Sequence, residues 1–171
     1  VAFSLFSSHE KRKKTKKTPF KKDCGLDKMF SSYFKYKETE DQLKAIKDVE
    51  GDLQKNFPTT RLLCGDVGFG KTEVALRAVF MCCYNKKKAA VVAPTKILSK
   101  QLYDEFVHRF SFFGYKTTSS TDLFITGNFD VLVGTHKVLN NSNALSLCSL
   151  LVVDEEHRFG VKQKEKIIKI N

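Results

Sequence analysis

The segment with the clearest chemical pattern is the glycine-rich run GDVGFGKT, whose residues are Gly65, Asp66, Val67, Gly68, Phe69, Gly70, Lys71 and Thr72. It satisfies the spacing GxxxxGK[ST], in which glycines let backbone N–H groups curl around phosphates. An apolar stretch precedes it and a helical pattern follows, so a helix N-terminus would add positive dipole. The run predicts an ATP phosphate site, with Lys71 on the terminal phosphates and Thr72 on Mg²⁺. An ordinary glycine turn is the alternative.

A second candidate group is acidic and lies further along the chain. The apolar run Leu150–Val153 ends at Asp154 and Glu155. In P-loop folds an acid at the carboxyl end of a strand binds Mg²⁺, and a neighbouring acid can orient the attacking water. We predict Asp154 as a metal ligand and Glu155 as catalytic together with Lys71. A solvated strand end is the alternative for the acidic motif. His157 is assigned a coupling role between this site and the rest of the protein, with a locally satisfied histidine as the alternative.

Three residues that precede the phosphate loop in the sequence, Phe34, Tyr36 and Gln42, could recognise a nucleotide base. Phe34 and Tyr36 could stack on adenine, and the Gln42 amide could read its edge with paired donor and acceptor groups. The alternative is that the two aromatics only pack where a helix begins. Gln42 completes the capping-box pattern TEDQ, which predicts a helix with apolar positions at Leu43, Ile46, Val49 and Leu53 that ends before Pro58.

Two further motifs stand where strands give way to helices. They are Ala93-Pro94-Thr95 and Gly134-Thr135-His136. Exposed N–H groups and hydroxyls at such positions suit nucleic-acid phosphates, so Thr95, Thr135 and His136 are candidate DNA-binding residues. By spacing alone they are only helix caps.

The elements around these motifs alternate between strand and helix. Strands are predicted at 61–64, 89–93, 129–133 and 150–154, with helices after residue 70 and over 95–110. Residues 110–128 show no clear pattern, and 117–121 read as loop. The alternation predicts an α/β fold whose mainly parallel sheet is covered by helices on both faces.

Composition sets the outer bounds. With 171 residues and 42% hydrophobic content, one domain plus a tail is expected. Residues 1–23 read as a basic linker or arm, because residues 1–22 hold eight Lys or Arg against Glu10 alone. The net charge of +11 favours a polyanionic partner such as nucleic acid, although solubility or an acidic membrane face would also account for it.

Cysteine usage and hydropathy restrict the compartment. The five cysteines include no CxxC pair, which indicates neither a zinc site nor a disulfide framework and favours a reducing compartment. No apolar run approaches the length that spans a bilayer, so no membrane partner is expected.

Taken together, five segments resemble the first motor domain of the transcription-repair coupling factor family, a branch of the superfamily 2 DNA translocases. They read FKYKETEDQ (34–42), RLLCGDVGFGKTEVALRA (61–78), APTKILSKQ (93–101), DVLVGTHKVL (130–139) and LVVDEEHRFGVKQKEK (151–166). The branch-migrating helicase RecG is the nearest competitor, but its usual pattern has serine at the position of Phe69 and glutamine at that of Glu156.

The resemblance implies a RecA-like P-loop domain over residues 24–171 that uses ATP and Mg²⁺ to move on double-stranded DNA. It implies a second RecA-like lobe, in the same protein or another chain, and RNA polymerase as a partner. A bacterial cytoplasmic, nucleoid-associated location is expected, with a plastid-type organelle as the alternative. The family usually carries a longer segment between Phe110 and Asp130, so one DNA-contacting part is expected to be shortened.

Since the sequence stops before a second lobe, the chain alone is expected to be nearly inactive as an ATPase. A RecG-like helicase fragment, a non-catalytic DNA- or polymerase-binding module and a decaying gene product are the competing hypotheses.

Overall fold

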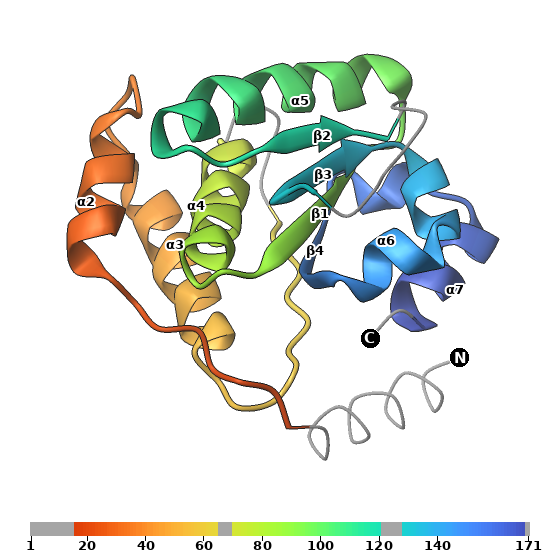
Figure 1. Ribbon diagram of the computed structural model, residues 1–171, viewed down its shortest axis with the longest axis horizontal. Coiled ribbons are helices and arrows are strands. Elements are labelled where there is room, and N and C mark those ends of the chain that lie inside the picture. Colours follow the sequence, from red (N-terminus) through yellow and green to blue (C-terminus); the bar gives the residue numbers. More distant parts are fainter. Residues whose placement is uncertain (1–15, 65–69, 121–127, 170–171) are drawn as a thin grey trace. The chain divides into compact units, whose positions relative to one another are not determined.

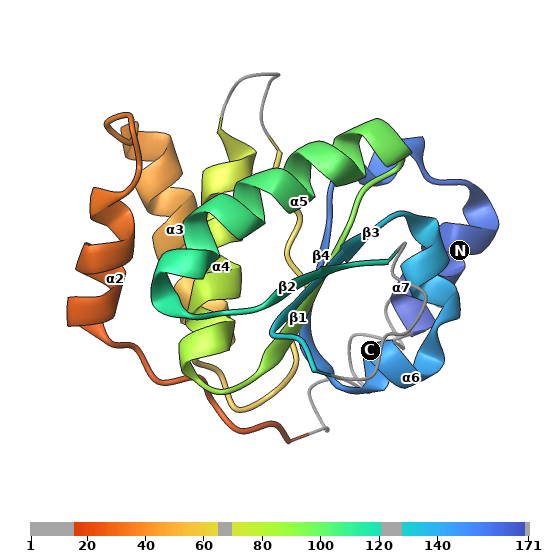
Figure 2. The same cartoon turned by 45° about the horizontal axis from the view of Figure 1, so that its top comes forward.

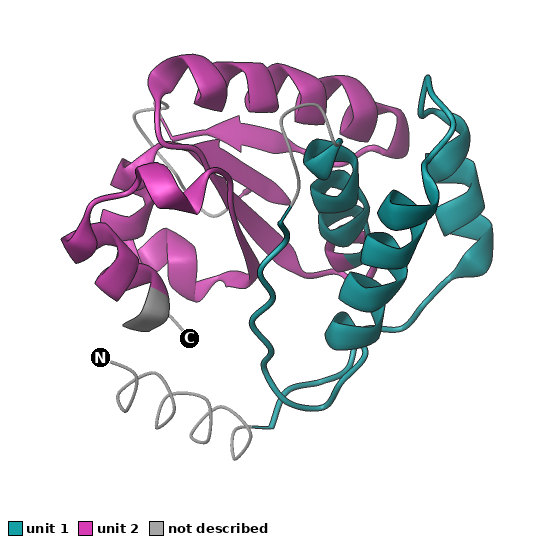
Figure 3. Cartoon of the chain, turned by 180° about the vertical axis from the view of Figure 1, so that it is seen from behind, with its two compact units in different colours: residues 1–81, 171 teal, residues 82–170 magenta. Residues whose placement is uncertain are grey.

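The computed structural model describes residues 16–64, 70–120 and 128–169 (Figure 1). The chain divides into two compact units, residues 1–81 with 171 and residues 82–170 (Figure 3). The boundary falls inside a helix, α4 (Lys71–Tyr84). All five cysteines are free thiols.

The described part of the first unit contains three helices: α2 (Cys24–Ser32), α3 (Glu40–Leu53) and the start of α4. The Asp23 carboxylate caps α2 by accepting from the backbone N–H groups of Gly25 and Leu26. Phe30 of α2 stacks on Phe80 of α4 with ring centroids 4.1 Å apart, and both side chains are buried. An aromatic contact therefore fastens α2 to α4, the helix that begins at Lys71.

The predicted helix after Thr39 is present and begins as expected. The Gln42 N–H donates to Thr39 Oγ1 over 3.2 Å, and the Thr39 N–H donates to Gln42 Oε1 over 2.9 Å, so both halves of the capping box form. Ile46 and Leu53 are buried as predicted, but Leu43 is half-exposed. The apolar face of α3 is thus narrower than the sequence period suggested.

Residues 16–22 are held against the first unit, which differs from the solvated arm expected for this part of the chain. Phe20 is buried, and its backbone N–H donates to the Leu53 carbonyl over 3.1 Å. The Lys17 ammonium donates to the same carbonyl over 3.0 Å, and Lys22 forms an ion pair with Glu50. The run of like charges predicted a solvated segment, and it gave no sign of this contact because a single buried residue, Phe20, makes it.

The second unit contains a four-stranded parallel sheet in the order β2-β3-β1-β4. The strands are β1 (Lys88–Val92), β2 (Thr117–Ser119), β3 (Val131–Gly134) and β4 (Cys148–Val153). Three match predicted strands within a few residues. The short strand β2 was predicted as loop, because three polar residues carry no apolar signal and take strand form only through pairing with β3.

Helices pack on both faces of this sheet. Helix α5 (Lys96–Phe110) lies along β2 and β3 (Figures 1 and 2) and buries Phe106 and Phe110. A second core joins alternate residues of the sheet to the opposite layer, made of η2 (His136–Asn140), α6 (Ser142–Ser146) and α7 (Val161–Lys169). A short turn, η1 (Ser111–Phe113), follows α5. The α/β class and the parallel sheet predicted from the sequence are confirmed.

Residues 61–64 do not form the predicted buried strand. They have no regular secondary structure and lie outside the sheet, and Leu62 is 73% exposed. The apolar run suggested a strand, but a strand also needs a neighbour, and none is present among the described residues of the first unit. Side-chain pairs from Arg61 to α3 hold this stretch instead.

Candidate functional site

The described end of the glycine-rich loop lies at the N-terminus of α4. Gly70 has φ of +73°, a left-handed conformation that favours glycine. Lys71 and Thr72 open the helix, and the Glu73 N–H donates to the Gly70 carbonyl over 2.9 Å. Lys71 is half-buried and Thr72 exposed. A helix N-terminus with a lysine and a hydroxyl is suited to binding an anion; the predicted loop residues 65–69 lie outside the described residues.

Gln42 lies directly against Gly70. The Gln42 side chain is buried, and a Cβ added at Gly70 would collide with its amide nitrogen Nε2. Its Oε1 is held by the Thr39 N–H, so the capping box fixes the orientation of the amide. The structure therefore brings the predicted base-recognition residue and the predicted phosphate loop together.

The two predicted aromatic residues contact each other ahead of α3. Their rings meet edge to face, with centroids 5.8 Å apart and an interplanar angle of 72°. Phe34 is half-buried, whereas Tyr36 is 68% exposed. The ring contact is the packing that the alternative expected, and the exposed face of Tyr36 is accessible to a stacking partner, so the arrangement fits both interpretations.

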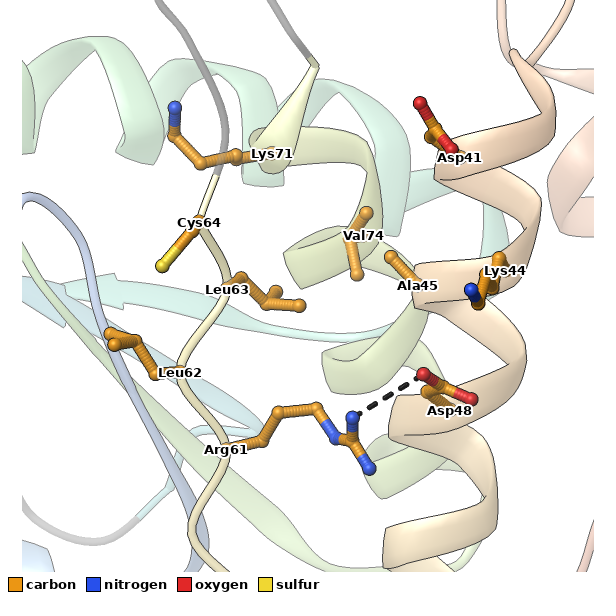
Figure 4. Close-up of a pocket in the computed structure, with 10 residues that line it drawn as sticks. All are labelled: Asp41, Lys44, Ala45, Asp48, Arg61, Leu62, Leu63, Cys64, Lys71 and Val74. Carbon is orange, nitrogen blue, oxygen red and sulfur yellow. Dashed lines mark hydrogen bonds and ion pairs between the residues drawn. The ribbon is translucent and has the colours of Figure 1, made fainter.

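A cavity of about 340 Å³ adjoins Lys71 within the first unit (Figure 4). It is lined by Asp41, Lys44, Ala45, Asp48, Arg61, Leu62, Leu63, Cys64, Lys71 and Val74. Among the described residues predicted to bind ATP, only Lys71 lines it.

Arg61 anchors the stretch that approaches the phosphate loop. Its Nε lies 2.5 Å from Asp52 Oδ2, and a second guanidinium nitrogen lies 3.4 Å from Asp48 (Figure 4). Burial raises the pKa of Asp52, but hydrogen bonds from Arg61 and Lys55 outweigh this effect and leave the pKa below its usual value. Ionised Asp52 therefore stabilises this connection.

The second unit carries the predicted acids at the carboxyl end of β4. The Asp154 N–H donates to the Val92 carbonyl over 2.8 Å, which extends the pairing of β4 with β1 by one residue. Glu155 has φ of +48° and ψ of +49°, a left-handed conformation rare for a residue with a side chain. Its Oε2 lies 2.9 Å from Arg158 Nε, so Glu155 forms an ion pair with the exposed Arg158 side chain.

The predicted DNA-binding residues share that edge of the second unit. Thr95 and Thr135 follow β1 and β3, which are adjacent parallel strands with Val92 opposite Gly134. Thr95 caps α5, with Oγ1 accepting from the Leu98 N–H over 3.2 Å, as the capping alternative required. Thr135 makes no side-chain cap to η2, and His136 is half-buried. His157 is exposed in η3 (Glu156–Arg158).

One group in the first unit was not predicted. Arg77, on α4, forms an ion pair with Glu73 one turn earlier, with Nε 2.6 Å from Oε1, and a second ion pair with Glu38. The Glu73–Arg77 spacing of four residues is a signal that the sequence contains. The pairing with Glu38 crosses between two segments and has no sequence signal.

The chemistry of these residues fits ATP with Mg²⁺. Hydroxyl and carboxylate oxygens are the ligands Mg²⁺ prefers, and it commonly takes one or two of them beside substrate phosphates. Thr72 and Asp154 are of this kind. Within the described ranges no cluster of three or more His, Cys, Asp or Glu is placed to hold a metal ion by itself.

Comparison with known proteins assigns the class. The model of the DEAD/DEAH box helicase family matches residues 39–171, and the chain belongs to that family. The fold agrees: RecG bound to a three-way DNA junction superposes with a TM-score of 0.78 and 29% identity over 89% of this chain and 22% of RecG. The UvsW helicase of bacteriophage T4 superposes with a TM-score of 0.64 and 18% identity over 90% of this chain and 58% of UvsW, a likeness of fold alone.

Among curated proteins, the chain is similar to transcription-repair-coupling factors. It is 39% identical to that of Borreliella burgdorferi over 99% of this chain and 38% identical to that of Escherichia coli over 98%. It is also 47% identical to a chloroplastic ATP-dependent DNA helicase of Arabidopsis thaliana over 81% of this chain. The chain spans 16–18% of these relatives. None of the described helices has the length and apolar character needed to cross a membrane.

Proposed function

We propose that this chain is the ATP-binding lobe of an ATP-dependent double-stranded-DNA translocase that acts in transcription-coupled repair by displacing stalled RNA polymerase. The observation that carries the ATP-binding part is the position of Gln42 against Gly70. It joins a base-recognition side chain to a phosphate loop, which is what a nucleoside triphosphate requires. Membership of the DEAD/DEAH box helicase family and likeness to transcription-repair-coupling factors support the rest.

Each predicted residue has a role in this proposal. Tyr36 and Phe34 stack on adenine, Gln42 reads its edge, and the backbone of residues 65–70 holds the phosphates. Lys71 neutralises the terminal phosphates. Thr72 and Asp154 would hold Mg²⁺, which when bound neutralises charge that develops on the phosphates. Glu155 orients the attacking water, and His157 couples the site to the rest of the motor.

Partners and location are also proposed. Thr95, Thr135 and His136 would bind the DNA backbone through hydroxyl and N–H groups at the sheet edge. A second RecA-like lobe would complete the cleft for hydrolysis, and RNA polymerase would be the displaced partner. The chloroplastic relative supports a plastid-type organelle beside the bacterial cytoplasm.

A RecG-like branch-migration function is the second candidate, favoured by the structural likeness to RecG. The two candidates differ in their DNA: a coupling-factor motor acts on linear duplex, whereas a branch-migrating enzyme requires a junction. Binding of this chain to a three-way junction with no measurable affinity for linear duplex would favour the second.

Calorimetry with Mg·ATP tests the ATP-binding part. The wild-type chain should bind, and Lys71→Ala should abolish binding because the phosphates lose their cation. Lys44→Ala is the matched control, since Lys44 lines the same cavity but has no assigned role. Absence of binding by the folded wild type, or equal binding by Lys71→Ala, would contradict the proposal.

A further inference from the structure

We infer that Arg77 and Glu38 are positioning residues for nucleotide recognition, holding the base-recognition segment in place relative to the phosphate loop. This inference rests on the proposed ATP-binding function. It assigns a role to the ion pairs that Arg77 forms with Glu73 and Glu38.

The contacts form a closed ring. From Gly70, the carbonyl accepts from the Glu73 N–H over 2.9 Å, and Glu73 Oε1 lies 2.6 Å from Arg77 Nε. The other arm of the Arg77 guanidinium pairs with Glu38, which directly precedes Thr39. The capping box joins Thr39 to Gln42. Gln42 closes the ring by lying against Gly70.

The ring is largely withdrawn from water. The side chain of Glu73 is 2% exposed, that of Arg77 11% and that of Glu38 19%. Ion pairs at such burial are screened less by solvent than surface pairs, and the fork of a guanidinium can bind two carboxylates at once. A lysine would supply the charge but would act as a single point donor.

The bridge, which is the pair of contacts from Arg77 to Glu73 and to Glu38, joins two segments with different predicted roles. Glu73 and Gly70 belong to the start of α4, where Lys71 and Thr72 are placed for the phosphates. Glu38 follows Tyr36 by two residues and precedes the capping box that orients Gln42. Glu38 is the point where this segment is tied to α4 by charge. Loosening it should therefore weaken recognition of the base and leave recognition of the phosphates in place.

Glu38→Ala is the sharpest test, because it opens the bridge while leaving the buried Glu73 paired with Arg77. Glu40→Ala is the matched control: it removes the same charge from an exposed position two residues later. Calorimetry on the 171-residue chain should compare Mg·ATP with Mg·tripolyphosphate, which has phosphates but no base. Glu38→Ala should weaken Mg·ATP binding about tenfold and change tripolyphosphate binding less than about twofold. Glu40→Ala should change neither.

Two further variants separate positioning from folding. Glu38→Gln keeps an acceptor oxygen and should recover most of the ATP affinity. Arg77→Lys should keep Glu73 neutralised yet lose ATP affinity, and adding Glu38→Ala to it should have little further effect, since both changes break one bridge. Thermal melting of each variant reports whether it is folded.

The outcomes are distinct. Equal weakening of ATP and tripolyphosphate by Glu38→Ala would make the bridge merely structural, and unchanged ATP binding would remove its role; either overturns the inference while the ATP-binding proposal stands. Failure of the wild type to bind ATP or tripolyphosphate would overturn both.

Discussion

The Arg158 guanidinium lies 2.9 Å from the Glu155 carboxylate of the same chain. Glu155 also has a left-handed backbone conformation at the end of β4. We expect this ion pair to orient the carboxylate that is predicted to activate water.

The backbone of Glu155 predicts an unusual order of stabilities. Glu155→Gly should be more stable than Glu155→Ala by about 1 kcal/mol, because a left-handed conformation costs a residue with a Cβ about that much. Both variants lose the ion pair with Arg158, so the comparison isolates the backbone. Chemical denaturation measures the difference; an alanine variant as stable as the glycine variant would show that position 155 carries no strain.

Turnover by the chain alone should be close to background with or without DNA. Without an arginine from a second lobe the rate should fall by roughly 10³, equivalent to about 4 kcal/mol of barrier. Steady-state ATPase assays check this, and activity should rise when a second-lobe fragment is added. Glu155→Gln should retain ATP binding. Robust DNA-stimulated hydrolysis by the wild type that Glu155→Gln abolishes would contradict the proposal that hydrolysis requires a second lobe.

Gly70→Ala should lower the free energy of unfolding by about 2 kcal/mol. The backbone conformation at Gly70 disfavours a Cβ, and the new methyl group would displace the Gln42 amide from its capping role. Combining it with Gln42→Ala should cost less than the sum of the single changes, since the collision is then removed. Urea denaturation tests this; additive effects would mean that the two residues do not meet.

The ion pair of Asp52 with Arg61 should make stability depend on acid. The Asp52 pKa is lowered in the folded state, so its contribution is complete above the unfolded value of about 3.9 and is lost as pH falls through the folded value. Asp52→Asn should cost about 2 kcal/mol at pH 7 and flatten the decline between pH 5 and 3.

Asp48→Asn is the control for this pair, because Asp48 is half-exposed and 3.4 Å from Arg61. Its effect should stay below about 0.5 kcal/mol. Parallel pH profiles of the wild type and Asp52→Asn in denaturant unfolding would contradict the assignment.

The basic segment should bind duplex DNA in a salt-dependent way. Deleting residues 1–15 removes Lys11, Arg12, Lys13 and Lys14 and should reduce the slope of log affinity against log salt by as much as about 3. Phe20→Ala is a charge-neutral control that should instead cost about 3 kcal/mol of stability, since Phe20 is buried. Fluorescence anisotropy at several salt concentrations gives the slope; an unchanged slope would leave the segment as a linker.

Local patterns predicted most of the elements that carry the site. The sequence predicted the capping box at Thr39, the helix N-terminus at Lys71 and the acids after β4, because each depends on residues close in sequence. The sequence did not predict the pairing of β2, the buried contact of Phe20 or the bridge from Arg77 to Glu38, because each depends on a partner brought near only by folding. Residues 61–64 were predicted wrongly for the same reason: their apolar run was visible, but the absence of a paired neighbour was not.

Residues 61–64 lead into the phosphate loop, and the side chain of Arg61 ties them to α3. Within the described ranges their backbone makes no hydrogen bond. Their amide protons should therefore exchange with deuterated water far faster than those of β1, which pairs on both sides. A ligand bound at Lys71 should slow exchange at these four amides first. Deuterium uptake there would report nucleotide occupancy without any label on the nucleotide.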